Sequence, residues 1–195
     1  MPLAFFSALI FLLAFGFPCI LYAKNSWKVR VQTDLHTIRD RVIFFFLLLA
    51  SEKTREQLYA VLSPEELAYE LCRLWFEEIY LPSRRYIRGW KGDFSPDSAA
   101  RFYQAFSDEE NEILDRFHCF LELRMDMIPD EHLAQKRIPQ NDLWHNIVRH
   151  ADHVLKALLP HPEAYKERLA EQMRQWLSDD ERNLPGHFLE PLLRR

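Results

Sequence analysis

The first 23 residues contain no charged side chain, and this constrains the chain more than any other feature of its sequence. From Leu3 to Tyr22 the run consists of Phe, Leu, Ile and Ala, with only four other residues before Tyr22. About 20 residues at a rise of 1.5 Å each match the roughly 30 Å hydrocarbon layer of a bilayer. Residues 1–23 are therefore predicted to be a transmembrane anchor that contacts membrane lipid.

A cleaved signal peptide is the main alternative for this run. Such a peptide has a basic stretch, a shorter apolar core and small residues before the cleavage site. Here no Lys or Arg precedes Lys24, and Leu21 stands where a small residue is required. Retention as an anchor is the expectation, and a secreted or periplasmic helical protein, formed by signal cleavage, stays as an alternative.

Basic residues on one flank of the run predict its orientation. Lys24, Lys28 and Arg30 follow the run, and no base precedes it. Since cytoplasmic flanks carry the excess of Lys and Arg, a single-pass topology with the bulk of the chain in the cytoplasm is expected. Residues 24–33 are interpreted as a basic juxtamembrane linker, and residues 34–195 as one helical domain.

The remainder of the chain is predicted to be all-α, an irregular bundle of about six or seven helices. Apolar residues recur at three- and four-residue steps, and polar N-cap residues precede these segments. The predicted N-caps are Ser63, Ser95, Ser107, Asn141 and Ser178. Residues 42–50 are too short to span a bilayer and too apolar to be exposed, so they are expected in a buried or membrane-abutting helix. Residues 27–31 alternate and predict either a short strand or the end of the anchor helix.

Composition excludes several classes of function. The chain has four glycines, and none has the spacing of a phosphate-binding loop or a nucleophile elbow. The net charge is −4, and residues 93–195 carry 20 acidic and 13 basic side chains, so no nucleic-acid partner is expected. Cys72 and Cys119 lie in helical apolar patterns and are predicted to be buried free thiols.

Histidines near carboxylates form one candidate site. Asp115 and His118 are three residues apart with Glu122 one turn later, and Asp142 and His145 repeat that spacing before His150 and His153. Paired acids and histidines on facing helices hold metal ions in some bundles. A metal-binding bundle enzyme that uses His118, His150 and His153 is the alternative function. The simpler interpretation is a set of surface or boundary histidines, with no cofactor.

A basic, aromatic segment forms the second candidate site. Its bases are Arg84, Arg85, Arg88 and Lys91, interleaved with Tyr86 and Trp90. Arginine binds phosphate oxygens, and Tyr and Trp favour membrane interfaces, so these bases predict contact with anionic lipid or phosphate. The alternative is a loop whose aromatic residues pack on the core while its arginines pair with the acidic second half.

No catalytic residues are predicted, because spacing alone brings no Ser–His, Cys–His or paired-carboxylate set together. The acidic positions of residues 108–127 are interpreted as a solvated helix face. The expected function is therefore that of a membrane-anchored helical interaction or scaffold protein with a protein partner.

Overall fold

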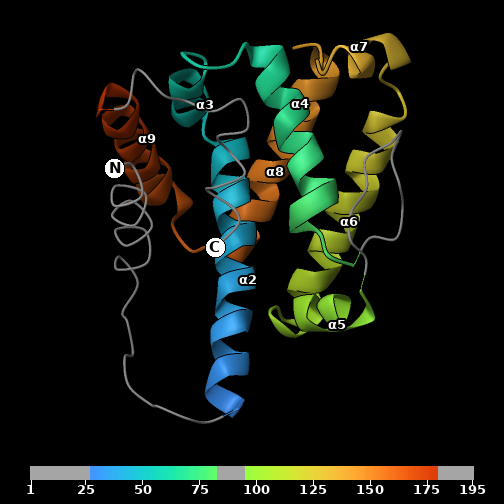
Figure 1. The fold of residues 1–195 in the computed structure, drawn as a ribbon, viewed down its shortest axis with the longest axis vertical. Coiled ribbons are helices and arrows are strands. Elements are labelled where there is room, and N and C mark those ends of the chain that lie inside the picture. Colours follow the sequence, from blue (N-terminus) through green and yellow to red (C-terminus); the bar gives the residue numbers. More distant parts are fainter. Residues whose placement is uncertain (1–26, 83–94, 180–195) are drawn as a thin grey trace, which may run out of the picture.

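The computed structural model describes residues 27–82 and 95–179, with side chains described for 37–82 and 95–175. Within these ranges the chain forms eight α-helices, one π-helical turn and no strand (Figure 1). The all-α prediction is confirmed. The elements are α2 (Trp27–Ala50), α3 (Glu52–Leu58), α4 (Pro64–Leu74), η1 (Trp75–Ile79), α5 (Pro96–Gln104), α6 (Asp108–Met125), α7 (Asp130–Ala134), α8 (Asp142–Leu158) and α9 (Pro162–Asp179).

Helix α2 is the central element, and α5, α8, α9 and η1 all pack against it (Figure 1). Its 24 residues give a rod of about 36 Å. From Val42 to Leu49 every side chain except Phe44 is buried, so the predicted apolar block is the centre of the bundle. The alternating residues 27–31 are helical, and the segment interpreted as a linker is part of α2 from Trp27 onward.

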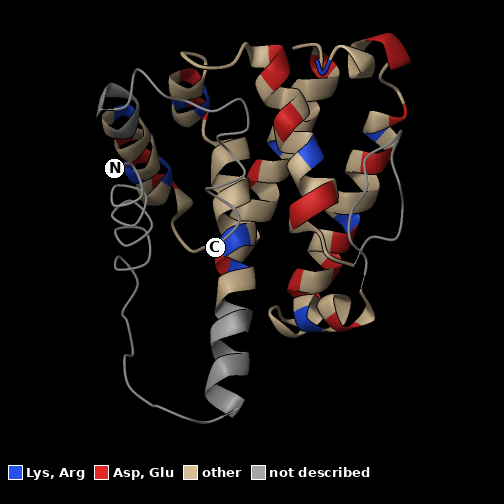
Figure 2. Cartoon of the chain, in the orientation of Figure 1, with Lys and Arg blue, Asp and Glu red and all other residues tan. Residues whose placement is uncertain are grey.

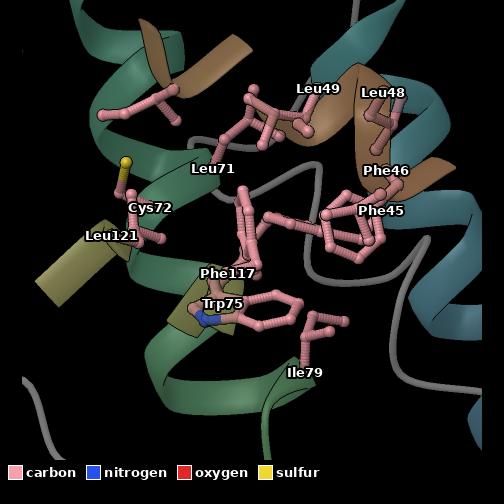
Figure 3. Close-up of a cluster of buried hydrophobic side chains, with 14 of the residues drawn as sticks. Phe45, Phe46, Leu48, Leu49, Leu71, Cys72, Trp75, Ile79, Phe117 and Leu121 are labelled. Carbon is pink, nitrogen blue, oxygen red and sulfur yellow. The ribbon is translucent and has the colours of Figure 1, made fainter. Parts of the chain in front are cut away.

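An aromatic cluster joins α2, η1 and α6 (Figure 3). The ring centroid of Trp75 lies 5.2 Å from that of Phe45, 5.4 Å from Phe46 and 5.0 Å from Phe117. All four side chains are buried. Each well-oriented aromatic pair contributes about 0.5–1.5 kcal/mol beyond its buried area, so this cluster fixes how the three elements pack.

The predicted N-caps differ in what their side chains do. Ser63 and Ser107 are N-caps, as the sequence predicts, and they form complete capping boxes with Glu66 and Glu110. Asn141 caps α8, since its side-chain oxygen accepts from the backbone of Leu143 at 3.0 Å. Ser95 occupies the N-cap position of α5, but its side chain makes no capping hydrogen bond. Ser178 is no N-cap, because it lies in the last turn of α9.

Two short helices, α3 and α7, raise the number of helices above the predicted six or seven. They contain seven and five residues. Neither is long enough for apolar periodicity to reveal it. Ser51 caps α3 by accepting from the Thr54 backbone at 3.2 Å, and both residues are buried.

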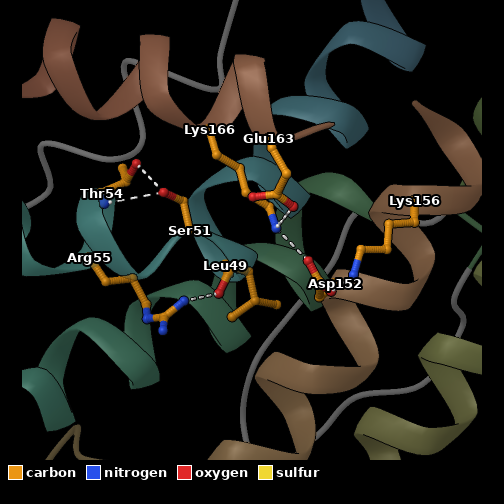
Figure 4. A network of polar contacts seen from close by, with 8 residues as sticks. All are labelled: Leu49, Ser51, Thr54, Arg55, Asp152, Lys156, Glu163 and Lys166. Atoms are coloured by element: carbon orange, nitrogen blue, oxygen red, sulfur yellow. Dashed lines mark hydrogen bonds and ion pairs between the residues drawn. The ribbon is translucent and has the colours of Figure 1, made fainter. Parts of the chain in front are cut away.

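Basic residues, which Figure 2 colours blue, connect helices that are distant in the sequence. Arg39 on α2 donates to both carboxylate oxygens of Glu110 on α6 at 2.7 and 2.6 Å, and to the Leu158 carbonyl at the end of α8 at 3.3 Å. The buried Arg55 donates to the Leu49 carbonyl in the last turn of α2, where the helix dipole favours a cation (Figure 4). These contacts satisfy carbonyls that the helix ends leave without an intrahelical partner.

The contacts between α8 and α9 are also ionic (Figure 4). Lys166 on α9 pairs with Asp152 on α8 and with Glu163 at 2.9 Å. Lys156 approaches the other oxygen of Asp152 at 2.6 Å. One carboxylate therefore holds two ammonium groups between these helices.

Among the helices of the described residues, none combines the length and the apolar character that crossing a bilayer requires. The predicted anchor, residues 1–23, lies outside the described residues. Cys72 and Cys119 are free thiols, as expected, but only Cys72 is buried. Cys119 is exposed because it lies off the buried stripe of α6 formed by Leu114, Phe117, Leu121 and Met125.

Candidate functional site

His118 on α6 lies in the aromatic cluster, where the Trp75 indole is one of its hydrogen-bond partners. The Trp75 Nε1–H group donates to His118 Nδ1 at 3.1 Å. An accepting Nδ1 carries no proton, so the neutral ring holds its proton on Nε2. That nitrogen lies 3.5 Å from Glu122 Oε1, and the ring stacks on Tyr80 with centroids 4.0 Å apart. This buried histidine is held by packing and by the indole together.

Tyr80 and Asp115 extend this arrangement toward solvent. The Tyr80 hydroxyl donates to Asp115 Oδ1 at 2.5 Å, and burial together with this carboxylate raises the pKa of Tyr80. The pKa of Tyr103 is raised as well, first by burial and then by Asp115. The Tyr80 phenol therefore stays protonated and acts as a hydrogen-bond donor.

A π-helical turn positions Trp75 and Tyr80 for these contacts. Helix α4 continues directly into η1, and the Tyr80 amide bonds to the Trp75 carbonyl at 2.9 Å across the wider turn. The two rings stack with centroids 5.2 Å apart. Single π-helical turns are frequent at functional sites, but here the turn serves the packing of His118.

On α8, His150 packs against two aromatic side chains of α6, Phe117 and Phe120. Burial, then the charges of His153 and Arg124, lower the pKa of His150. The His150 ring stacks on Phe120 with centroids 4.3 Å apart. His150 is thus a neutral ring that packs between α6 and α8.

His118 and His150 lie in different surroundings. Across residues 27–82 and 95–179, no set of three or more His, Cys, Asp or Glu side chains is arranged to hold a metal ion. His118 faces Trp75 and Tyr80, whereas His150 faces Phe120. The basic candidates Arg84, Arg85, Arg88 and Lys91 lie outside the described residues.

The outer face of α6 is the feature that the sequence interpretation missed. Leu123 and Met127 are 65% and 63% exposed, the largest values among the exposed large apolar side chains of the described residues. Cys119, one turn before Leu123, is exposed too. We call Cys119, Leu123 and Met127 the α6 strip. Its sequence signal is the phase, since Cys119 and Leu123 lie opposite the buried stripe of α6, and Met127 follows in the turn after the C-cap.

No family model, no curated protein and no solved structure matches this chain, so the geometry described above is the basis for interpreting its function.

Proposed function

We propose that the chain is a helical interaction module that residues 1–23 tether to a membrane, with residues 34–195 on the cytoplasmic side. The apolar run ends at Ala23, and α2 begins at Trp27. Helix α2 then continues without a break into the buried core. This continuity supports the proposal, because a tethered N-terminus would hold the whole bundle close to the bilayer.

The observation that carries the interaction role is the α6 strip. Exposed apolar side chains that gather on one face are typical of surfaces that bind other proteins. Leu123 lies on α6 and Met127 in the turn after its C-cap, and neither is among the described apolar residues that pack on the core. We infer that a protein partner covers them.

The course of the helices leaves this strip accessible beside a membrane. Arg39 contacts Glu110 at the start of α6, and Phe46, two turns further along α2, contacts Phe117. The two helices therefore run in the same direction. The N-terminal end of α2 projects from one end of the bundle, whereas α6 ends near α7 at the other (Figure 1). A tether at the start of α2 places the strip away from the bilayer.

Fractionation of cells that express the full chain tests the tether. We expect the full chain in the membrane pellet after alkaline carbonate and in the supernatant only with detergent. A variant lacking residues 1–23 is the matched control, and it is expected in the aqueous fraction with unchanged helical circular dichroism. Recovery of the full chain without detergent contradicts the proposal, and an intact mass beginning near Lys24 supports signal cleavage instead.

Photo-crosslinking in cells tests the interaction surface. A photoreactive residue at Leu123 should give a discrete adduct, whereas the same residue at Glu167, an exposed position on α9, should not. Equal adducts at both positions, or none at Leu123, would contradict a partner on the strip.

Measuring bound transition metal by elemental analysis tests the alternative function, a metal-binding enzyme. The interaction module should carry no stoichiometric transition metal. A stoichiometric metal in the purified full chain that is lost in His150→Ala would overturn the interaction module and support the enzyme.

A further inference from the structure

The outer face of α6 carries its exposed residues in one stripe along the helix. Its exposed residues recur at alternating steps of four and three, which is the step pattern of the facing positions in paired helices. They are Glu112, Arg116, Cys119, Leu123 and Asp126. Asp126 is the C-cap of α6 and keeps right-handed helical dihedrals, so the pattern extends through it. We call Arg116, Cys119, Leu123 and Asp126 the α6 seam.

We propose that the α6 seam binds a second copy of this chain, with the two α6 helices antiparallel. The inference deepens the proposed function and rests on it, because it names the partner that covers the α6 strip. Closed twofold pairing is the commonest form of self-association, and it requires a surface that is complementary to itself.

Charge along the seam supplies that complementarity. In an antiparallel pair, Arg116 faces Asp126 of the second copy, and Cys119 faces Leu123 of the second copy. The twofold axis repeats both contacts, so four layers combine two ion pairs with two apolar contacts. A parallel pair would instead place Arg116 against Arg116 and Asp126 against Asp126, and such like-charge contacts are destabilising. The antiparallel arrangement is therefore the favoured one.

The present contacts of Arg116 leave it able to pair across the seam. Its guanidinium lies 3.1 Å from Glu112 on the same helix, and the two side chains are 66% and 69% exposed. Ion pairs this exposed contribute little to stability, so Arg116 can exchange Glu112 for another carboxylate at little cost. Met127 flanks Leu123 and is covered with it when the two copies meet.

The pairing has a geometric consequence for the tether. Because α2 and α6 run in the same direction, an antiparallel α6 pair directs the N-terminal ends of the two α2 helices to opposite ends of the dimer. Copies anchored by residues 1–23 would then pair between two facing membrane surfaces. The seam thus predicts contact between membranes rather than within one.

Charge exchange in full-length chains tests the pairing. Arg116→Asp and Asp126→Arg should each lower dimer formation in detergent at least tenfold, because each alone places like charges opposite one another. An equimolar mixture of the two variants should restore it, since the mixed dimer forms one ion pair of the original sign and one of reversed sign. Loss without restoration in the mixture, while circular dichroism is unchanged, would overturn the proposal.

Disulfide formation tests the register. In a Cys19→Ala background, Leu123→Cys should oxidise with copper phenanthroline to a species of twice the 23.4 kDa chain mass, through Cys119 of the second copy. At least tenfold less of this disulfide-linked dimer should form in two controls. They are the background chain alone and Leu123→Cys combined with Cys119→Ser. If these two controls, each with one cysteine in the α6 seam, give as much disulfide-linked dimer as Leu123→Cys, the pairing is parallel and the inference is wrong.

Vesicles distinguish this inference from the tether. Two dye-labelled populations of vesicles that both carry the full chain should aggregate. Vesicles carrying Arg116→Asp should also aggregate with vesicles carrying Asp126→Arg. Chain that floats with vesicles without aggregating them retains the tether and refutes the antiparallel pair. Chain that does not float refutes the tether, while the detergent experiments still decide the pairing.

Discussion

Trp75 and His118 hold each other in one arrangement, because the indole donates to a ring nitrogen that carries no proton. A residue that keeps an acceptor at that point should preserve the pair. We expect His118→Asn to lower the free energy of unfolding less than His118→Leu, because Leu leaves the buried indole N–H without a partner. The difference should be about 1–3 kcal/mol in urea titrations. Equal losses would show that packing alone holds Trp75.

His150 gives the fold a dependence on pH. Its pKa in the folded state lies below the ordinary 6.5, chiefly because of burial and then because of His153 and Arg124. As the pH falls below 6.5, the unfolded chain therefore binds a proton at His150 more readily than the folded chain does. This stabilises the unfolded state relative to the folded state. We expect the free energy of unfolding to fall as the pH drops from 7.5 to 5.5.

The matched variant for this effect is His150→Gln, which removes the titrating ring and keeps a polar side chain. Its free energy of unfolding should decline less over the same pH range. The comparison is made between the two slopes, because other carboxylates and histidines titrate in both proteins. Identical slopes would assign the pH dependence to those groups.

At the scale of single helices, the caps provide a test with an internal control. Ser63 and Ser107 each satisfy a backbone amide and complete a capping box, but the Ser95 side chain makes no such bond. We expect Ser63→Ala and Ser107→Ala to lower the free energy of unfolding by about 1 kcal/mol each. Ser95→Ala should change it by less than about 0.5 kcal/mol. Equal losses at all three positions would contradict the assigned role of these hydrogen bonds.

Long elements could be predicted from the sequence, but short ones could not. Apolar residues at helical spacing indicate α6 and α8, and the serine–glutamate pairs locate the starts of α4 and α6. Helices α3 and α7 are too short to show a period, and the π-helical turn η1 differs from an α-helix by backbone bonds that side-chain patterns do not report. The sequence thus predicts the long helices, but it does not predict the π-helical turn that positions Trp75.

At the scale of the whole molecule, the sequence located the candidate residues but not their neighbours. The spacing of His118 from Asp115 indicates a candidate residue, yet the place of His118 in the fold depends on Trp75, 43 positions away. Arg39 joins α2, α6 and α8 across 71 and 119 positions, and nothing near Arg39 in the sequence indicates that contact. The α6 strip was missed for the related reason that burial of one face is decided by which helices pack against it.

Because α2 is unbroken, the number of residues before Arg39 determines the side of the bundle from which the preceding chain leaves the helix. Each residue of an α-helix turns the chain by about 100°, so adding two residues before Arg39 would swing whatever precedes the helix to roughly the opposite side of the bundle. Seven added residues, close to two full turns, would restore the heading and only lengthen the rod by about 10 Å. Natural variation in this stretch should therefore come in steps of whole turns.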